Sequence, residues 1–264
     1  MMEGQALRRT IIVVAVVVGL AAVPAAQIDP TPPRVAVTVV QVLPEMVEAW
    51  HNAVRDEAIP AQKKAGVAWR RTYANGPFGQ GFTFVTVTPI ASYAQYDRAG
   101  ALERTLGIDG LAKYNAIVRP LLVSTHTTAM TPQPDLSIVS NTRPPAPFVV
   151  VQTLHPLPGR GPEYYAIMAA DYLPVYRKAG IKDYWFYTSS FGAPPTVMIF
   201  RPISKLAELD EPSPLTQAMN KALGTDAAMK LSLRRNALLS SIGPTDVQRF
   251  VPELSFDMPA TKTR

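Results

Sequence analysis

The sequence predicts an α+β protein built from two consecutive copies of one strand–helix–strand–strand–helix–strand unit. Three observations lead to this fold class. The motif "PAQKKAG" (60–66) recurs as "PVYRKAG" (174–180), other short motifs recur in the same order, and apolar β-branched segments alternate with segments of helical spacing. The composition is globular, because 47% of the 264 residues are hydrophobic and only 17% are charged.

The repeated motifs keep their order along the chain. "VQ" at 40–41 corresponds to "VQ" at 151–152, and "PDLS" at 134–137 corresponds to "PELS" at 252–255. The offset between the copies drifts only from 111 at the first pair to 118 at the second. Two copies of roughly 100 residues indicate a duplication, since a solenoid requires at least three shorter units.

Periodicity and stop signals place the elements of the first copy. Pro60 falls in the last turn of the first helix, where it should kink or loosen that turn, and Gly66 suits the left-handed position just past a helix end. The expected elements are strands at 37–43, 67–73, 82–88 and 121–129, a helix at 45–64 and a broken helical stretch at 90–118.

The second copy repeats this order, which is that of the ferredoxin-like unit. Its expected strands lie at 148–154, 181–188, 196–200 and 238–242. Strands such as "VAVTVVQVL" are apolar almost throughout, so helices should cover one face of each sheet and the other copy's sheet the second face. The expected organisation is signal peptide 1–26, Pro-rich segment 27–34, first repeat 35–130, Pro-rich linker 131–147, second repeat 148–256 and C-terminal tail 257–264.

The first 26 residues have the form of a secretory signal peptide. Arg8 and Arg9 precede an apolar run, Ile11–Val23, which leads into small residues. A run of 13 residues is short for a bilayer, which needs about 20. We therefore expect cleavage after Ala25 or Ala26 and export to the periplasm or the extracellular space. The alternative is retention by an uncleaved N-terminal segment.

Several function classes are excluded. The chain has no cysteine, so it has no disulfide, thiolate nucleophile or cysteine zinc site. Its net charge of +6 comes from scattered residues, with no basic aromatic stretch typical of a nucleic-acid groove. It has no G-x-S-x-G elbow and no P-loop. The three glycines of 76–81 join two strands, whereas a dinucleotide fingerprint leads into a helix.

The repeated motifs carry a resemblance. The "K-A-G" helix ending and the pair "PIASYAQYD" (89–97) and "PISKLAELD" (202–210) resemble the dimeric α/β-barrel superfamily. The segment 158–187 is most similar to NIPSNAP-like domains. The resemblance implies a tandem pseudo-dimer, with two sheets forming one barrel in a single chain. It implies no single activity, because the superfamily contains cofactor-free monooxygenases, isomerases, haem proteins and domains of unknown role.

The candidate catalytic residues are His51 and Glu57 on the first helix. Glu57 and Asp171 each stand three residues before the helix-ending proline, so they form either an acid–base pair or solvated carboxylates that pair with a nearby cation. His51 either acts as a base or donates a hydrogen bond at the edge of a core. Its counterpart Tyr165 and the carboxylate of Asp171 are candidate ligand contacts.

The three histidines, at 51, 126 and 155, form no metal-binding motif. We expect no metal and no cofactor. A haem held by one histidine, 51 or 126, is a third alternative, which rests on haem-binding members of the superfamily that the chain resembles.

The remaining candidate ligand contacts lie on strands. Gln41 and Gln152 sit inside apolar first strands, where they either bond one another across the pseudo-twofold axis or point at a ligand. An aromatic set alternates along the second strand of each copy, so that it either lines a pocket for a flat organic molecule or fills the barrel. The set is Trp69, Arg71 and Tyr73 in the first copy, and Asp183, Trp185 and Tyr187 in the second.

Two functions follow from these observations. The first is a small-molecule binding or structural module. The second is a cofactor-free monooxygenase or isomerase that acts on a hydrophobic or aromatic molecule. An enzyme requires polar groups that converge on a closed cavity, whereas a structural module has a filled barrel with polar groups at its rim. Expected partners are a hydrophobic small molecule but no nucleic acid and no stably inserted membrane; the chain is a monomeric pseudo-dimer or a higher homo-oligomer.

Overall fold

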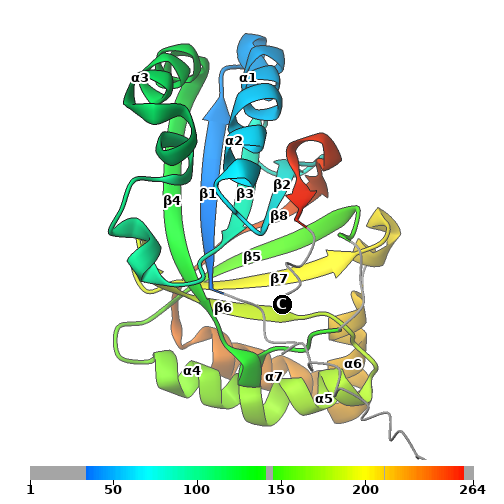
Figure 1. Ribbon diagram of the computed structural model, residues 1–264. Coiled ribbons are helices and arrows are strands. Elements are labelled where there is room, and N and C mark those ends of the chain that lie inside the picture. Colours follow the sequence, from blue (N-terminus) through cyan, green and yellow to red (C-terminus); the bar gives the residue numbers. More distant parts are fainter. Residues whose placement is uncertain (1–33, 141–144, 211, 259–264) are drawn as a thin grey trace, which may run out of the picture.

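Eight antiparallel strands close into a barrel in the computed structural model, which describes residues 34–140, 145–210 and 212–258 (Figure 1). The strands follow one another in the order β3-β1-β4-β6-β7-β5-β8-β2, and β2 pairs with β3 to complete the circle. The expected signal peptide lies outside the described residues. No helix within the described ranges is long and apolar enough to cross a membrane.

The first half of the chain contributes strands in the order β4-β1-β3-β2 and three helices that pack on their outer face. Short 3-10 turns connect several of the described elements. The elements of this half are β1 (Val35–Val42), α1 (Val47–Ala53), α2 (Ile59–Lys64), β2 (Trp69–Asn75), β3 (Thr83–Pro89), α3 (Ala101–Val118) and β4 (Leu122–Pro132).

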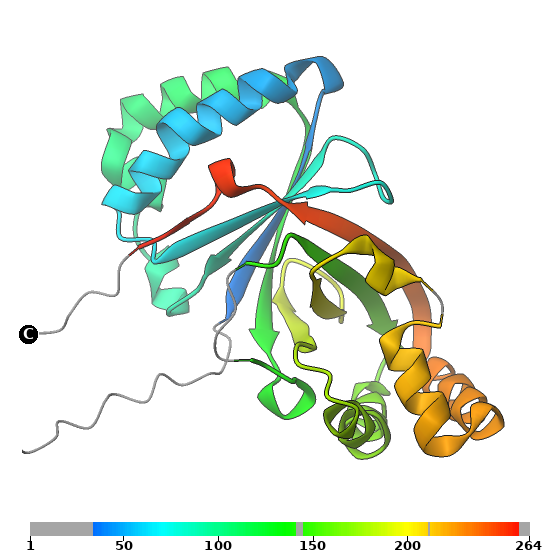
Figure 2. The ribbon, with the colours of Figure 1, turned by 90° about the vertical axis from the view of Figure 1, so that its right-hand side faces the viewer.

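The second half has the matching strand order β8-β5-β7-β6. The halves join where β4 pairs with β6 and where β2 pairs with β8. Figure 2 shows the helices of each half on opposite outer faces of the barrel. The elements of this half are β5 (Phe148–Pro156), α4 (Gly161–Ile167), α5 (Leu173–Lys178), β6 (Trp185–Phe191), β7 (Val197–Ile203), α6 (Pro214–Leu223), α7 (Thr225–Asn236), β8 (Leu239–Phe250) and the short β9 (Phe256–Asp257), which pairs with β2.

Both faces of each half-sheet are buried, as the apolar strands predict. On β1, Val35 and Val37 face the barrel interior, while Val40 and Val42 pack against the helices of the first half. A separate core joins the second half-sheet to α4, α5, α6 and α7. The barrel therefore has an interior core and two outer cores, and each outer core lies where a ferredoxin-like unit packs its helices.

Each first helix contains a π-helical turn just before its proline. These turns are Val54–Ala58, ahead of Pro60, and Met168–Tyr172, ahead of Pro174. Proline has no N–H to donate and its ring crowds the preceding turn, so a wider turn relieves both conflicts. The sequence predicts a loosened last turn; in the structure the helix widens one turn earlier, and the last turn is regular.

The last strand is longer than the sequence predicts. Gly243 and Pro244 were expected to follow the strand, yet β8 continues to Phe250. Gln152 pairs with Thr245 and Leu154 with Ile242, so two residues of β8 oppose one residue of β5. This β-bulge accommodates a proline that could not donate to a regular ladder.

The "PDLS" and "PELS" motifs fasten each half to the other. The Ser137 hydroxyl oxygen accepts a hydrogen bond from the Phe186 N–H at 3.0 Å, and the Ser255 oxygen accepts one from the Thr72 N–H at 2.9 Å. Ile138 also bridges to Tyr184. The first part of the expected linker 131–147 is therefore packed against the second half, whereas 141–144 lie outside the described residues.

Candidate functional site

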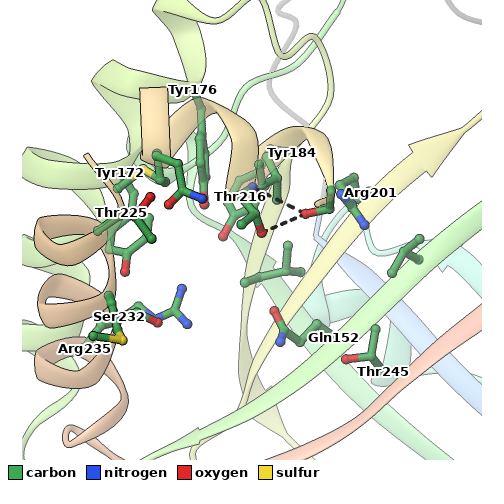
Figure 3. Close-up of a pocket in the computed structure, with 18 residues that line it drawn as sticks. Gln152, Tyr172, Tyr176, Tyr184, Arg201, Thr216, Thr225, Ser232, Arg235 and Thr245 are labelled. Atoms are coloured by element: carbon green, nitrogen blue, oxygen red, sulfur yellow. Dashed lines mark hydrogen bonds between the residues drawn. The ribbon is translucent and has the colours of Figure 1, made fainter. Parts of the chain in front are cut away.

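A cavity of about 530 Å³ lies in the second half, between the half-sheet and the helices (Figure 3). Its sheet wall comes from β5, β7 and β8, and its helix wall comes from the π-helical turn Met168–Tyr172, α5, α6 and α7. The bulge of β8 borders the cavity, because Gln152 and Thr245 both line it. The main polar lining residues are Gln152, Tyr172, Tyr176, Tyr184, Arg201, Thr216, Thr225, Ser232, Arg235 and Thr245.

Local sequence features bring these side chains inward. Tyr172 and Tyr176 stand four residues apart, so they share one helix face, and their rings pack with centroids 5.9 Å apart. Ser213 caps α6: its oxygen accepts a hydrogen bond from the Thr216 N–H at 3.3 Å, and the two hydroxyls lie 3.0 Å apart. The start of α6 therefore faces the cavity.

Arg235 is held in a fixed orientation at the end of α7. Its Nε and Nη2 atoms both donate to Asn236 Oδ1, at 3.1 and 2.9 Å. Its guanidinium carbon lies 5.0 Å from the centre of the Tyr172 ring, within cation–π range. Within the described residues Nη1 makes no hydrogen bond, and the guanidinium lines the cavity.

The Tyr172 hydroxyl is buried in this wall beside the Ser232 hydroxyl, but the two groups do not meet hydrogen-bond geometry in the described part of the chain. The residue is only 3% exposed. A buried hydroxyl without a well-formed hydrogen bond costs about 1–3 kcal/mol, so a molecule in the cavity that accepts from Tyr172 relieves this cost.

The tyrosines of the cavity are neutral donors. Burial raises the pKa of Tyr172, Tyr176 and Tyr184, and the positive charge of Arg235 opposes each shift. The phenols therefore keep their protons at neutral pH. Arg201 and Arg235 carry positive charge, and no Asp or Glu stands among the described residues that line the cavity.

The barrel interior brings together five of the predicted ligand contacts, namely Trp69, Arg71, Tyr73, Trp185 and Tyr187. The space that they leave is about 70 Å³, so the barrel is almost filled. Arg71 Nη2 donates to Asp257 Oδ1 at 2.6 Å, and Arg71 Nη1 donates to the Phe256 carbonyl at 3.0 Å. Asp183 does not face this space: its carboxylate is buried and accepts a hydrogen bond from the Ser140 hydroxyl at 2.9 Å.

The two candidate catalytic residues lie in the first half, away from both spaces. The His51 ring packs edge-on against Phe84 with centroids 5.0 Å apart, and its buried Nε2 has no hydrogen-bond partner among the described residues. Burial lowers the pKa of His51, and the Glu253 carboxylate opposes that shift. Glu57 is exposed on its π-helical turn. No contact joins it to His51 in the part of the chain that the structure describes.

The two glutamines do not occupy equivalent positions. Val35 pairs with Pro89, the first residue of "PIASYAQYD". Val149 pairs with Pro202, the first residue of "PISKLAELD". The two valines are therefore equivalent, at an offset of 114 residues. Gln41 therefore matches His155 rather than Gln152. Gln41 lies on the barrel-facing side of β1, whereas Gln152 points to the helices and lines the cavity. An odd shift in register places a side chain on the opposite face of a strand, so the two amides do not face each other.

Two further predicted contacts lie outside the cavity. Tyr165 packs edge-on against Phe186 in the outer core, with centroids 5.8 Å apart. Asp171 Oδ2 lies 3.6 Å from Arg234 Nη2 on α7, in a solvent-exposed ion pair. The cation that pairs with Asp171 is thus an arginine from another helix.

The cavity does not fit a haem held by histidine. None of the three histidines belongs to the lining. His51 lies in the first half, His126 is exposed on β4, and His155 Nδ1 lies 3.3 Å from Thr196 Oγ1 at the end of β5.

Sequence reasoning missed the two arginines and the three tyrosines of the cavity. Arg201 follows four apolar residues within β7, and Arg235 stands in the last turn of a helix, where basic residues are common. Tyr172 and Tyr176 gave the one usable signal, because they share an inward helix face. That spacing also fits ordinary core packing, so it does not by itself indicate a site.

No protein-family model and no curated protein matches this sequence. Among solved structures, the chain is similar to an anthrone oxidase-like protein, with a TM-score of 0.51 and 9% identity over 84% of this chain and 93% of that chain. It is also similar to a candidate monooxygenase from Fusobacterium nucleatum subsp. nucleatum, with a TM-score of 0.50 and 10% identity over 83% of this chain and 93% of that one. The fold is that of a dimeric α/β barrel. A mutant chlorite dismutase from Candidatus Nitrospira defluvii matches less well, with a TM-score of 0.49 and 12% identity over 83% and 92% of the two chains.

Proposed function

We propose that this α/β barrel binds a small organic anion in the cavity of its second half. One observation carries the proposal: a space of about 530 Å³ is lined by the Arg235 guanidinium and several neutral donors, with no carboxylate among its described lining residues. Charges interact more strongly in a partly buried site than in bulk water, so the Arg235 guanidinium there favours an anionic ligand.

The shape and lining of the cavity support an organic ligand rather than a small inorganic ion. At about 30 Å³ per water molecule, the space equals roughly 18 waters, which is within the range of small-molecule sites. Apolar side chains and tyrosine rings form much of the wall between the two arginines. The apolar members are Val150, Ile199, Leu215 and Met219.

Binding is better supported than catalysis. A general base needs a pKa near the working pH, and the described lining contains no histidine, aspartate or glutamate. The raised pKa of each cavity tyrosine keeps it protonated at neutral pH, so it is not available as a base. The candidates His51 and Glu57, which remain predictions, would have to act somewhere other than this cavity.

The test is a thermal-shift series on one ring system. Naphthalene-2-carboxylate should raise the melting temperature, whereas 2-naphthamide and 2-naphthylmethylamine should not, because only the first carries an anion. At 100 times its Kd a ligand adds about 2.7 kcal/mol to stability. Arg235→Gln should abolish the shift, and Arg55→Gln, an exposed arginine of the first half, should preserve it. Equal shifts from all three compounds would refute the proposal.

The second candidate function is cofactor-free oxygenation or isomerisation of a hydrophobic or aromatic molecule. A lining with the Arg235 guanidinium and several neutral donors also suits the anionic form of an acidic phenol or enol, which would enter without needing a base. A structural neighbour is described as anthrone oxidase-like, so anthrone is a suitable probe. Oxygen uptake that requires both anthrone and Arg235 would favour this function. No uptake above the protein-free rate would exclude anthrone oxidation.

We also infer that the chain arose by tandem duplication of a NIPSNAP-like unit and is exported. The shared strand order, the paired π-helical turns and the paired "PDLS" and "PELS" contacts support the duplication. The basic and apolar N-terminal sequence supports export. N-terminal sequencing of the protein from its host tests cleavage after Ala25 or Ala26; an intact Met1 in the mature protein would contradict it. Light scattering tests whether the chain, which supplies both halves of the barrel, is monomeric in solution.

A further inference from the structure

Resting on this proposed function, we infer that the ligand is an amphiphile, with an acid bound at Arg235 and an apolar tail that leaves the cavity past Met229. The cavity extends along α7, because its lining includes Thr225, the first residue of that helix, and Arg235, the last but one. At a rise of about 1.5 Å per residue, their backbone positions lie about 15 Å apart. Figure 3 shows Thr225, Ser232 and Arg235 along one side of the space.

The Arg235 end is the place for the acid. The Arg235 guanidinium lies over the ring of Tyr172, a residue that is only 3% exposed. Asn236 accepts hydrogen bonds from its Nε and Nη2 atoms, so little conformational freedom is lost when a ligand binds. A carboxylate accepts several hydrogen bonds at once, so it can bind Arg235 and the Tyr172 hydroxyl together.

The opening of the cavity lies elsewhere along its length. Four lining residues are exposed, and they mark this opening: Thr216 on α6, Thr225 and Met229 on α7, and Thr245 on β8. Gly224 alone joins α6 to α7, so the two helices form a hairpin whose bend adjoins Thr225. A molecule with its acid at Arg235 therefore has its other end beside this hairpin.

Apolar surface continues from the opening across the hairpin. Met229 is 56% exposed, and Leu233, one turn further along α7, is 63% exposed. On α6, Leu223 is 42% exposed and follows one turn after Met219, a buried lining residue. We call Leu223, Met229 and Leu233 the apolar strip. Because Met229 belongs to both the strip and the lining, the apolar surface runs without a break from the cavity to the outside.

An apolar tail accounts for the position of this strip. Single apolar residues are common on protein surfaces, but these three adjoin the opening of a cavity. A compact anion inside the cavity would leave the strip in water, whereas a tail on the strip removes apolar area of both partners from water. The ligand class is therefore a carboxylic acid with a long alkyl tail.

Isothermal titration calorimetry with three probes on one ring system tests this inference. The parent is naphthalene-2-carboxylate, the second probe carries an octyloxy tail at position 6, and the third carries there a 2-(2-ethoxyethoxy)ethoxy tail of equal length and higher polarity. The octyloxy probe, used below the concentration at which it aggregates, should bind wild type at least ten times more tightly than the other two. Burial of about two methylene groups supplies that factor.

Variants of the strip test where the tail lies. Leu223→Ser combined with Leu233→Ser should cut the affinity for the octyloxy probe at least fivefold. The same variant should leave the affinity for the parent within twofold, because neither leucine lines the cavity. Ile108→Ser, which alters a 76% exposed residue of α3 in the first half, should change neither affinity. Arg235→Gln should weaken all three probes.

The outcomes separate this inference from the proposed function. Equal wild-type affinities for the octyloxy and ether-tailed probes would overturn the amphiphile and leave an anion site in place. Binding of none of the probes, with the parent tested to millimolar concentration, would overturn the anion site itself. The wild-type comparison is decisive even if a variant fails to fold.

Two further results would overturn the role of the strip. One is an octyloxy gain that persists in the double leucine variant, which would place the tail elsewhere. The other is a wild-type dimer, seen by light scattering, that the double variant abolishes while the octyloxy gain is unchanged. That result would assign the strip to contact between two copies of the chain.

Discussion

Arg70 and Tyr184 occupy the same position in the two halves of the barrel. Arg71 pairs with Val87 on β3, and Trp185 pairs with Phe200 at the corresponding place on β7. Arg70 and Tyr184 directly precede these two residues. Arg70 is buried and donates to four acceptors: Thr72 Oγ1, the Leu254 carbonyl, Gln62 Oε1 and Thr86 Oγ1. Tyr184 instead lines the cavity. In the first half, the Arg70 guanidinium and its acceptors thus occupy the region that corresponds to the cavity beside Tyr184 in the second half.

Arg70→Lys should lower the free energy of unfolding by about 1–3 kcal/mol. Burial lowers the pKa of Arg70 to about 10, so the group is still charged at neutral pH. A lysine has one charged nitrogen and cannot replace the planar donor set, which leaves buried acceptors unpaired. Urea denaturation measures the change, with the exposed Arg55→Lys as control. A loss no greater than that of the control would contradict this account of Arg70.

Tyr172→Phe should separate a binding role from a structural one. Removing a buried hydroxyl that lacks a partner should leave stability unchanged or raise it by up to about 1 kcal/mol. The same change should weaken naphthalene-2-carboxylate binding at least fivefold, because it removes a donor beside Arg235. Tyr187→Phe, inside the barrel, is the matched control and should preserve affinity. Reduced stability with unchanged affinity would assign the hydroxyl to the fold.

His51 should make stability fall at acid pH. Burial holds its pKa in the folded protein below the ordinary value of 6.5, so the unfolded chain takes up this proton first. Stability should therefore decrease as pH falls from about 6.5 towards the lowered pKa, and this contribution should level off below it. His51→Gln should shrink the drop in melting temperature between pH 7.5 and pH 5, whereas His126→Gln, exposed on β4, should not. An identical drop in both variants would contradict the assignment.

The fold was predictable because its signals are local. Apolar strands, the two "K-A-G" helix endings and the order of paired motifs each depend on a few neighbouring residues. The register of the strands was harder to predict. The two "VQ" pairs look equivalent in the sequence, yet the observed strand pairing places their glutamines on opposite faces of their strands. The length of β8 was also missed, because a Gly-Pro pair indicates a break unless a bulge accommodates it.

The cavity was not predictable in the same way. Arg201 and Arg235 lie on different elements, and only the packing of α7 across the half-sheet brings them to one space. Five of the six residues in the set on the second strands line the barrel interior and Asp183 does not, and neighbouring side chains leave only about 70 Å³ beside them. Whether a set of side chains encloses space or fills it depends on every neighbour, and a single sequence does not contain that information in local form.

The most direct test compares the two spaces as binding sites. Naphthalene-2-carboxylate should be titrated calorimetrically into wild type, into Arg235→Gln from the second-half cavity and into Arg71→Gln from the barrel interior. The account predicts at least a tenfold loss of affinity in Arg235→Gln and a change below twofold in Arg71→Gln. Unchanged binding in Arg235→Gln with a loss in Arg71→Gln would place the ligand inside the barrel and contradict the central claim.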